Sequence, residues 1–228
     1  MAKELGLRFA VWKWCRWCLV WLVIGVFGFC GRNSWAAADP SRNLSASLWA
    51  GYYLPQDINF QRVYSDDGQL AWFVEFSKTW FGQIEAAAGA GGTNFNGYKL
   101  RDEGDSSISK AQMSLGAGYI QCSYLFRYTE GQRLVPYFGG GMDAWGYREK
   151  KEGDKTIKGD KYGYHGLAGI RFLLDWLDPE AAGSSEQEYG INNTYLVLEA
   201  RWLKIDNFGE NKLDLSGRLY RLGLLWEF

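Results

Sequence analysis

The feature that most constrains the fold is the alternation of apolar and polar residues at the end of the sequence. Large apolar residues occupy every second position, with small or polar residues at three of the positions beside them: Leu222, Leu224, Trp226 and Phe228 against Arg221, Gly223 and Glu227. Successive side chains of a β-strand point to opposite faces, so one face of this segment is apolar. Because the sequence stops on this strand, we expect lipid to cover that face, as in a transmembrane β-barrel.

The first 38 residues are typical of a cleaved secretory signal peptide. Four basic residues precede an apolar core from Cys18 to Phe29, and Ala36 to Ala38 offer a small-residue cleavage site. The core is short for a membrane-spanning helix. An uncleaved membrane anchor and a lipoprotein attached at Cys30 are alternatives, although Phe29 stands where a lipoprotein signal requires a small residue. We therefore expect a signal peptide at 1–38 and one barrel domain at 39–228.

Composition excludes several classes of protein. Three of the 4 cysteines lie in the signal segment, which leaves Cys122 alone and excludes a disulfide scaffold or a cysteine-built zinc site. We therefore predict no cofactor and no metal. The chain has 12 Trp, 14 Tyr, 13 Phe and 29 Gly, as expected for a barrel with aromatic girdles and a crowded interior. Removing the basic signal leaves the remainder acidic, which gives no electrostatic case for nucleic acid.

Seven further segments alternate in the same way, so we predict an all-β, eight-stranded antiparallel up-and-down barrel. Each segment has about the length that a tilted strand needs to cross a membrane. The expected lipid-facing residues are Leu44, Ala46, Leu48, Ala50 and Tyr52; Leu70, Trp72, Val74 and Phe76; Ile84, Ala86, Ala88 and Ala90; Ile120, Cys122, Tyr124, Phe126 and Tyr128; Phe138, Met142 and Ala144; Tyr164, Ala168, Ile170 and Phe172; Leu196, Leu198, Ala200 and Trp202. In the fourth segment Met113, Leu115 and Ala117 have the opposite parity, so we expect a bulge near 116–118.

The connections alternate in length, which orients the barrel. Long charged loops are expected at 55–69, 92–109, 148–161 and 206–212, and tight turns at 78–82 and 129–134. The long set would face outward and the short set the periplasm. One long periplasmic turn, 175–194, departs from this rule, and Pro179 to Ala182 could begin a short helix in it. The loop 148–161 is rich in bases; we expect solvent exposure there, or contact with lipopolysaccharide phosphates.

At this point the chain resembles a known family. The runs LVPYFGGG at 134–141 and GYHG at 163–166, together with the aromatic terminus, resemble the small outer-membrane β-barrel family that includes the OmpA barrel and the OmpX- and OmpW-like proteins. The resemblance implies an outer-membrane location in a Gram-negative bacterium. It also implies that the terminal strand is the signal for the barrel-assembly machinery, through Tyr220, Leu222, Leu224, Trp226 and Phe228.

Charged residues on the inner faces decide between a channel and a plug. The residues expected in this polar network are Glu75, Glu85, Arg127, Asp143, His165, Arg171, Glu199, Arg201 and Arg221. Eight strands enclose room only for side chains or one small ligand, so four carboxylates and four arginines can pair and fill the interior. We expect Arg171 to pair with Glu199. The predicted lumen is a polar plug, with a gated narrow conduit and a catalytic cluster as alternatives.

His165 is the single histidine of the chain, and its partner bears on catalysis. A register that pairs Tyr147 with Tyr162 would bring Asp143 close to His165. An aspartate that orients a histidine is part of hydrolytic triads, but no nucleophile is evident beside this pair. The eight-stranded lipid A deacylase has a similar architecture and a His-x-Ser arrangement; here residue 167 is Leu and the serine is missing. We therefore interpret the pair as a structural hydrogen bond.

The sequence thus predicts a monomeric, non-enzymatic outer-membrane barrel that presents surface loops and contacts outer-membrane lipids and lipopolysaccharide. A narrow conduit for ions or small apolar molecules is one alternative. An envelope lipid-modifying enzyme is another. A secreted, soluble lipocalin-like barrel is the alternative at the level of fold.

Overall fold

The computed structural model describes residues 43–64, 68–100, 108–129, 131–151, 156–209 and 213–228. The chain divides into two compact units, Met1–Ala38 and Asp39–Phe228. The expected signal peptide lies outside the described residues, and the barrel belongs to the second unit. Within the described ranges, neither helix is long and apolar enough to span a membrane.

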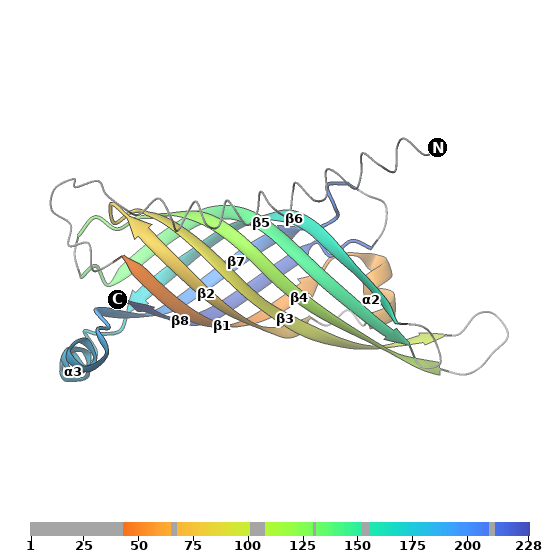
Figure 1. Cartoon of the computed structure of the whole chain (residues 1–228), viewed down its shortest axis with the longest axis horizontal. Coiled ribbons are helices and arrows are strands. Elements are labelled where there is room, and N and C mark those ends of the chain that lie inside the picture. Colours follow the sequence, from red (N-terminus) through yellow and green to blue (C-terminus); the bar gives the residue numbers. More distant parts are fainter. Residues whose placement is uncertain (1–42, 65–67, 101–107, 130, 152–155, 210–212) are drawn as a thin grey trace. The chain divides into compact units, whose positions relative to one another are not determined.

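The second unit is a closed barrel in which each strand pairs antiparallel with its neighbours along the chain (Figure 1). Pairing of the first strand with the last closes it. The strands are β1 (Leu44–Pro55), β2 (Gln69–Trp80), β3 (Ile84–Leu100), β4 (Ile108–Leu125), β5 (Leu134–Lys151), β6 (Ile157–Leu173), β7 (Asn193–Lys204) and β8 (Gly217–Glu227). The predicted eight-stranded up-and-down barrel is therefore confirmed.

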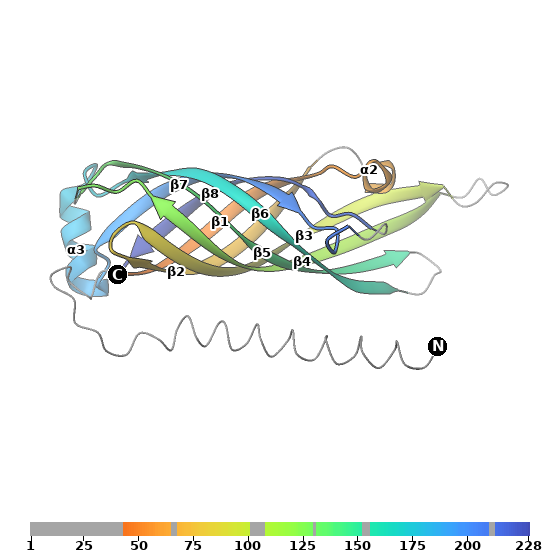
Figure 2. The same cartoon turned by 90° about the horizontal axis from the view of Figure 1, so that it is seen from above.

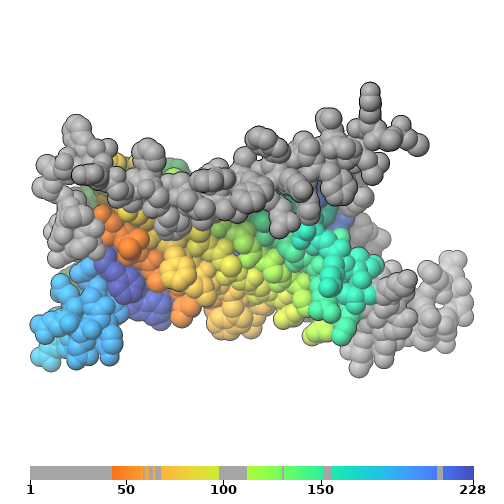
Figure 3. Space-filling view, in the orientation of Figure 1, coloured from red at the N-terminus to blue at the C-terminus, as the bar shows by residue number. Residues whose placement is uncertain are grey.

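The assignment of residues to the two faces is also confirmed. On β2 the exposed fractions are 66% for Trp72 and 44% for Val74, whereas Glu75 between the apolar positions is 3% exposed. On β8, Leu222 and Leu224 point outward and Arg221 inward, as predicted. Figure 3 shows part of this outer face, where side chains of β1, β2 and β8 pack side by side. The exterior therefore carries an apolar belt around a barrel with buried charges inside.

Beyond this belt, the apolar residues change to the inner face without any change in pairing. On β3, Phe95 is fully buried between exposed Asn94 and Asn96, and on β4 Met113 and Leu115 are buried as well. The register runs unbroken through this region, with Gly118 opposite Ala90 and Gly116 opposite Gly92. The predicted bulge is therefore wrong. The same side chains still point inward and outward. Above the belt, however, the outward residues are polar and the inward ones apolar, because water replaces lipid outside the barrel.

Two expected loops are largely strand. β3 and β4 remain paired as far as Leu100 and Ile108, in place of the loop predicted at 92–109. β5 and β6 likewise remain paired as far as Glu149 and Ile157. The residues between these strands, 101–107 and 152–155, lie outside the described ones. Long hairpins pair in this way because polar residues above the membrane still satisfy their backbone groups across the ladder.

Helices lie at the two ends of the barrel. Helix α3 (Pro179–Tyr189) is in the predicted periplasmic turn, at the end that holds the C-terminus, and α2 (Ile58–Tyr64) is at the opposite end (Figures 1 and 2). Pro179 is in the first turn of α3, and Asp178 caps it by accepting a hydrogen bond from the Ala181 N–H at 3.0 Å. The helix proposed to begin at Pro179 is thus present.

Candidate functional site

The interior of the barrel is the candidate site, because it gathers nearly all the buried charge of the described residues. Its centre is a network of two carboxylates and two arginines. Glu199 accepts hydrogen bonds from Arg201 Nε at 2.5 Å and from Arg221 Nη2 at 2.6 Å. Glu75 accepts from Tyr119 Oη at 2.6 Å and from the same two guanidinium groups at 3.3 and 3.4 Å. All five side chains are 5% exposed or less, so the centre is electrically balanced and closed.

Aromatic rings and an amide complete the central network. The Arg221 guanidinium lies 4.0 Å from the centre of the Trp49 ring, and that of Arg201 lies 4.2 Å from the centre of the Tyr119 ring. Arg201 also donates to Gln121 Oε1 at 2.5 Å. Such ring faces attract cations and occupy the space between the charged groups. Together these side chains connect β7 and β8 with β2 and β4 across the interior of the barrel.

A second ion pair lies nearer the periplasmic end. Arg171 Nη2 donates to Glu85 Oε1 at 2.6 Å, and the hydroxyls of Ser77 and Thr79 donate to Oε2 of the same glutamate. The expected pairing of Arg171 with Glu199 is therefore wrong. Glu199 instead accepts from the Tyr137 hydroxyl at 2.8 Å, and the Tyr137 ring lies between the two groups, 5.0 Å from the Arg171 guanidinium.

The periplasmic mouth carries a third ion pair. Arg127 follows the end of β4 and is only half-buried, and its Nη1 donates to Glu227 Oε1 at 2.8 Å. Asn193 donates to the other oxygen of Glu227 at 2.8 Å. Glu227 is 2% exposed and is missing from the predicted network. The sequence could have indicated that Glu227 is inside the barrel, because it alternates with the outward-facing apolar residues Trp226 and Phe228.

His165 and Asp143 are in contact, but through a register other than the expected one. Asp143 is opposite Gly163, and Tyr147 is opposite Gly159 instead of Tyr162. The contact is diagonal: His165 Nδ1 lies 2.6 Å from Asp143 Oδ2, and both side chains are buried. The other ring nitrogen, Nε2, has no hydrogen-bond partner. Among the described residues, no hydroxyl or thiol is therefore placed on it as a nucleophile.

The outer part of the interior is apolar and aromatic. It contains Tyr53, Phe60, Tyr64, Phe95, Met113, Leu115, Trp145, Leu203, Ile205, Leu215 and Leu219. Helix α2 contributes Phe60, whose ring centre lies 5.0 Å from that of Phe95. The Tyr64 hydroxyl donates to Glu149 at 2.8 Å; burial, and then this hydrogen bond, raise the pKa of Tyr64 well above its usual range. A hydrophobic core under α2 therefore closes the outer end.

Lys161 is a buried residue that the sequence reasoning missed. The sequence assigns it to a solvated loop, but it lies within β6 on the inner face and is 3% exposed. His165 and Gly163 of the GYHG segment are on the inner face. Continuing the alternation two positions upstream would have placed residue 161 on the same face. The charge-rich surroundings of residue 161 concealed this parity.

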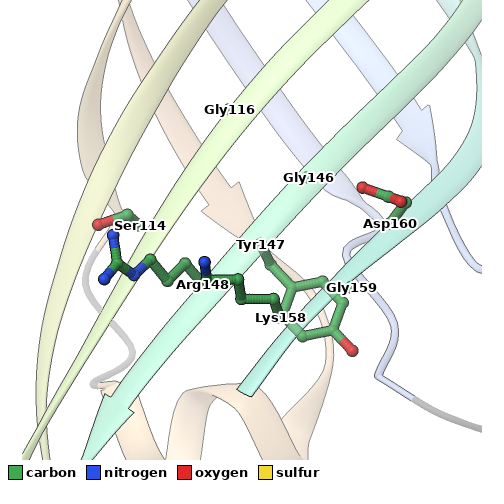
Figure 4. Close-up of a pocket in the computed structure, with 8 residues that line it drawn as sticks. All are labelled: Ser114, Gly116, Gly146, Tyr147, Arg148, Lys158, Gly159 and Asp160. Atoms are coloured by element: carbon green, nitrogen blue, oxygen red, sulfur yellow. The ribbon is translucent and has the colours of Figure 1, made fainter. Parts of the chain in front are cut away.

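The outer surface carries one basic groove near the outer end of β4, β5 and β6. Its volume is about 490 Å³, and Ser114, Gly116, Gly146, Arg148, Lys158 and Asp160 contribute to its lining (Figure 4). Ser114, Arg148 and Lys158 are directly paired across the three strands. Arg148 and Lys158 are exposed like charges opposite each other, an arrangement that disfavours pairing unless an anion lies near.

Comparison with known proteins supports the fold. No protein-family model matches the chain, and no curated protein matches it. The outer membrane protein OprG from Pseudomonas aeruginosa aligns with a TM-score of 0.59 at 13% identity, over 82% of this chain and 96% of that chain. Neisserial surface protein A (NspA) aligns with a TM-score of 0.53 at 12% identity, over 81% and 97%. At these identities, the likeness concerns the fold alone.

A further similarity is to the outer membrane enzyme PagL, with a TM-score of 0.39 at 14% identity over 78% of this chain and 97% of that chain. This value is too low to support any argument about activity. The two higher scores agree with the apolar belt, the closed antiparallel topology and the charged interior. The chain therefore has the fold of the small outer-membrane β-barrels.

Proposed function

We propose that this protein is a non-enzymatic, monomeric barrel of the Gram-negative outer membrane, with a closed lumen, that presents its outer hairpins at the cell surface. The observation that carries the proposal is the central network around Glu75 and Glu199, in which buried guanidinium groups, carboxylates and rings occupy the cross-section. The outer-membrane location rests on the lipid-facing belt and the fold. The monomeric state is supported by closure of the barrel, which pairs the strand edges within the apolar belt; above it, β3 extends beyond its last pair with β2, at Thr93.

Planar-bilayer recording tests the closed lumen. The purified barrel should show no steady conductance, because displacing a paired, buried charge costs several kcal/mol. Large, stable single-channel steps from the unmodified protein would contradict the plug and favour the narrow conduit. Heat-modifiable migration on gels, recorded on the same preparation, ensures that the barrel measured is folded.

The enzymatic alternative depends on His165, since it is the one residue in the described interior that resembles part of a hydrolytic triad. Its Nδ1 is held by Asp143, but Nε2 has no hydrogen-bond partner. Hydrolysis by such a dyad requires a nucleophile within hydrogen-bond reach. We therefore propose a structural role for the pair. We expect identical lipid A mass profiles from cells with and without the protein. A deacylated species found only in cells with the protein would favour the enzyme.

Lipopolysaccharide is the proposed surface partner, and the basic groove of Figure 4 is where its phosphates would bind. Arg148 and Lys158 are exposed above the apolar belt, and Ser114 adds a hydroxyl in the same row. A phosphate between two cations removes their mutual repulsion and accepts several charge-assisted hydrogen bonds. Gly116 leaves the backbone open to the phosphate, whereas the Asp160 carboxylate lies over Gly146, so the phosphate would bind in the row of Ser114, Arg148 and Lys158.

The terminal strand is the proposed signal for the barrel-assembly machinery. Phe228 follows β8, its N–H donates to the Leu44 carbonyl oxygen at 2.8 Å, and its side chain is 37% exposed on the lipid side. Phe228→Asp should lower the amount of folded barrel in the outer membrane, because it places a charge at the interface and removes the terminal aromatic. Heat-modifiability in membrane fractions measures this, with Tyr189→Asp, an exposed aromatic of α3, as the control. Equal yields for the two variants would contradict an assembly role.

A further inference from the structure

Among the described residues, the buried polar atoms without partners fall into two groups, on either side of the central network. Toward the periplasm they are Ser45 Oγ, Ser123 Oγ, Arg127 Nε and Arg171 Nε and Nη1; toward the outer end they are Trp145 Nε1, Lys161 Nζ and His165 Nε2. A buried polar group without a partner is costly, so each group requires water or a ligand. The periplasmic group lies next to the half-buried mouth at Arg127, where water can reach it. The outer group lies beneath an aromatic core.

Two donors of the outer group belong to directly paired residues. Trp145 on β5 and Lys161 on β6 are cross-strand partners, and both side chains are 3% exposed and lie on the inner face. Side chains paired in this way have their Cβ atoms about 5 Å apart. An indole N–H and an ammonium group can only donate hydrogen bonds. The missing partner must therefore be an acceptor.

An anion is the acceptor that best suits a buried ammonium group. The described carboxylates on the inner face of β5 both have other partners: Asp143 is held by His165 at 2.6 Å, and Glu149 accepts from the Tyr64 hydroxyl at 2.8 Å. Lys161 forms no ion pair with any described residue, so its positive charge is uncompensated in a buried position. An isolated ammonium group removed from water costs several kcal/mol unless an opposite charge accompanies it. An anion beside Lys161 Nζ would supply the missing partner.

The neighbouring residues limit the size of the anion. The Trp145 ring packs against Tyr53 at 5.1 Å between centres, and the Tyr53 hydroxyl is already used, donating to the Leu215 carbonyl oxygen at 2.5 Å. Residue 163, between Lys161 and His165 on the inner face, is a glycine, and the backbone of Lys204 and Ile205 occupies the place of a side chain there, so this position adds no space. We propose that Trp145 and Lys161 hold a small monovalent anion, a halide ion or a carboxylate group, in the outer half of the lumen.

Urea unfolding of the full barrel, folded in zwitterionic vesicles, tests this. Sodium bromide and sodium acetate are compared with sodium gluconate, whose anion is too large for the chamber, at equal ionic strength. At an anion concentration about 100 times its dissociation constant, the unfolding equilibrium constant of the wild type should fall about 100-fold. An effect of bromide alone identifies a halide site and an effect of acetate a carboxylate site; both support an anion. Equal midpoints in all three salts would overturn the proposal.

Matched variants localise the effect. Lys161→Met should abolish the salt-specific shift, whereas Lys150→Met, which removes an exposed lysine of the neighbouring strand β5, should retain it. Trp145→Phe keeps a ring but loses the N–H donor, so its shift should be smaller. A shift in Lys161→Met equal to that of the wild type would place the anion elsewhere and overturn the proposal. If Lys161→Met does not fold, crystals of the wild type soaked in bromide and in acetate decide: anomalous bromide density or acetate density beside Lys161 Nζ supports the site, and the absence of both refutes it.

Discussion

Replacing Arg171 with methionine is expected to lower the free energy of unfolding by about 3–5 kcal/mol, because a buried carboxylate loses its ionic partner. Arg171 and Glu85 are each 3% exposed or less and lie 2.6 Å apart. The double variant Arg171→Met/Glu85→Gln should be less destabilised than the single variant, since no charge is then left unpaired. Urea unfolding in vesicles measures both values.

Arg171→Met/Glu199→Gln is the control for this cycle. Glu199 is held by Arg201, Arg221 and Tyr137, so the second change should add to the cost instead of relieving it. If Glu199→Gln restored as much of the free energy of unfolding lost in Arg171→Met as Glu85→Gln does, the pairing of Arg171 with Glu85 would be contradicted. The two second-site variants therefore distinguish the observed partner from the one expected on neighbouring strands.

Arginine at the middle of the apolar belt is expected to destabilise the barrel by about 2–4 kcal/mol. Leu224 on β8 is level with Leu48 on β1 and Leu196 on β7, and it is 40% exposed on the outer face. Leu224→Arg should therefore show the full effect. Tyr220→Arg, four residues along the same strand and near the outer edge of the belt, should cost about 0–1 kcal/mol.

Spin labels check the same assignment without a change of stability. A label at Val74 should contact lipid and report high oxygen accessibility, whereas one at Glu75 should not, since Val74 is 44% exposed outside and Glu75 is 3% exposed inside. Equal accessibility at the two positions, or equal unfolding energies for Leu224→Arg and Tyr220→Arg, would contradict the assigned belt.

The membrane-spanning part of the fold could be predicted from the sequence because one rule applies throughout it. Lipid outside and paired charges inside force an alternation with a period of two, which is enough to assign Val74, Leu198 and Leu224 to the outer face. The rule fails above the membrane. There Met113 and Leu115 are apolar because they are inside, and a rule that equates apolar with outward infers a bulge that the pairing does not contain.

The partners within the interior could not be predicted, since they depend on geometry across the barrel. Strand neighbours are known from the order of the chain, but Glu85 on β3 and Arg171 on β6 are not neighbours, and they meet only because the barrel is narrow. Lys161 shows a second limit. A lysine in a charge-rich segment is usually solvated, and only the true extent of β6 places it inside.

The exchange of polarity between the two faces also determines how deeply the barrel is immersed. If the barrel moved toward the periplasm by two residues along a strand, roughly 5 Å at the usual tilt, exposed Arg218 and Lys204 would approach the hydrocarbon. A shift outward would expose Trp72 and its neighbours to water. Both displacements are opposed, so in a bilayer that is too thick or too thin the lipid should deform around the protein while the barrel keeps its height. The hairpins would then project a constant distance above the surface, whatever the composition of the membrane around them.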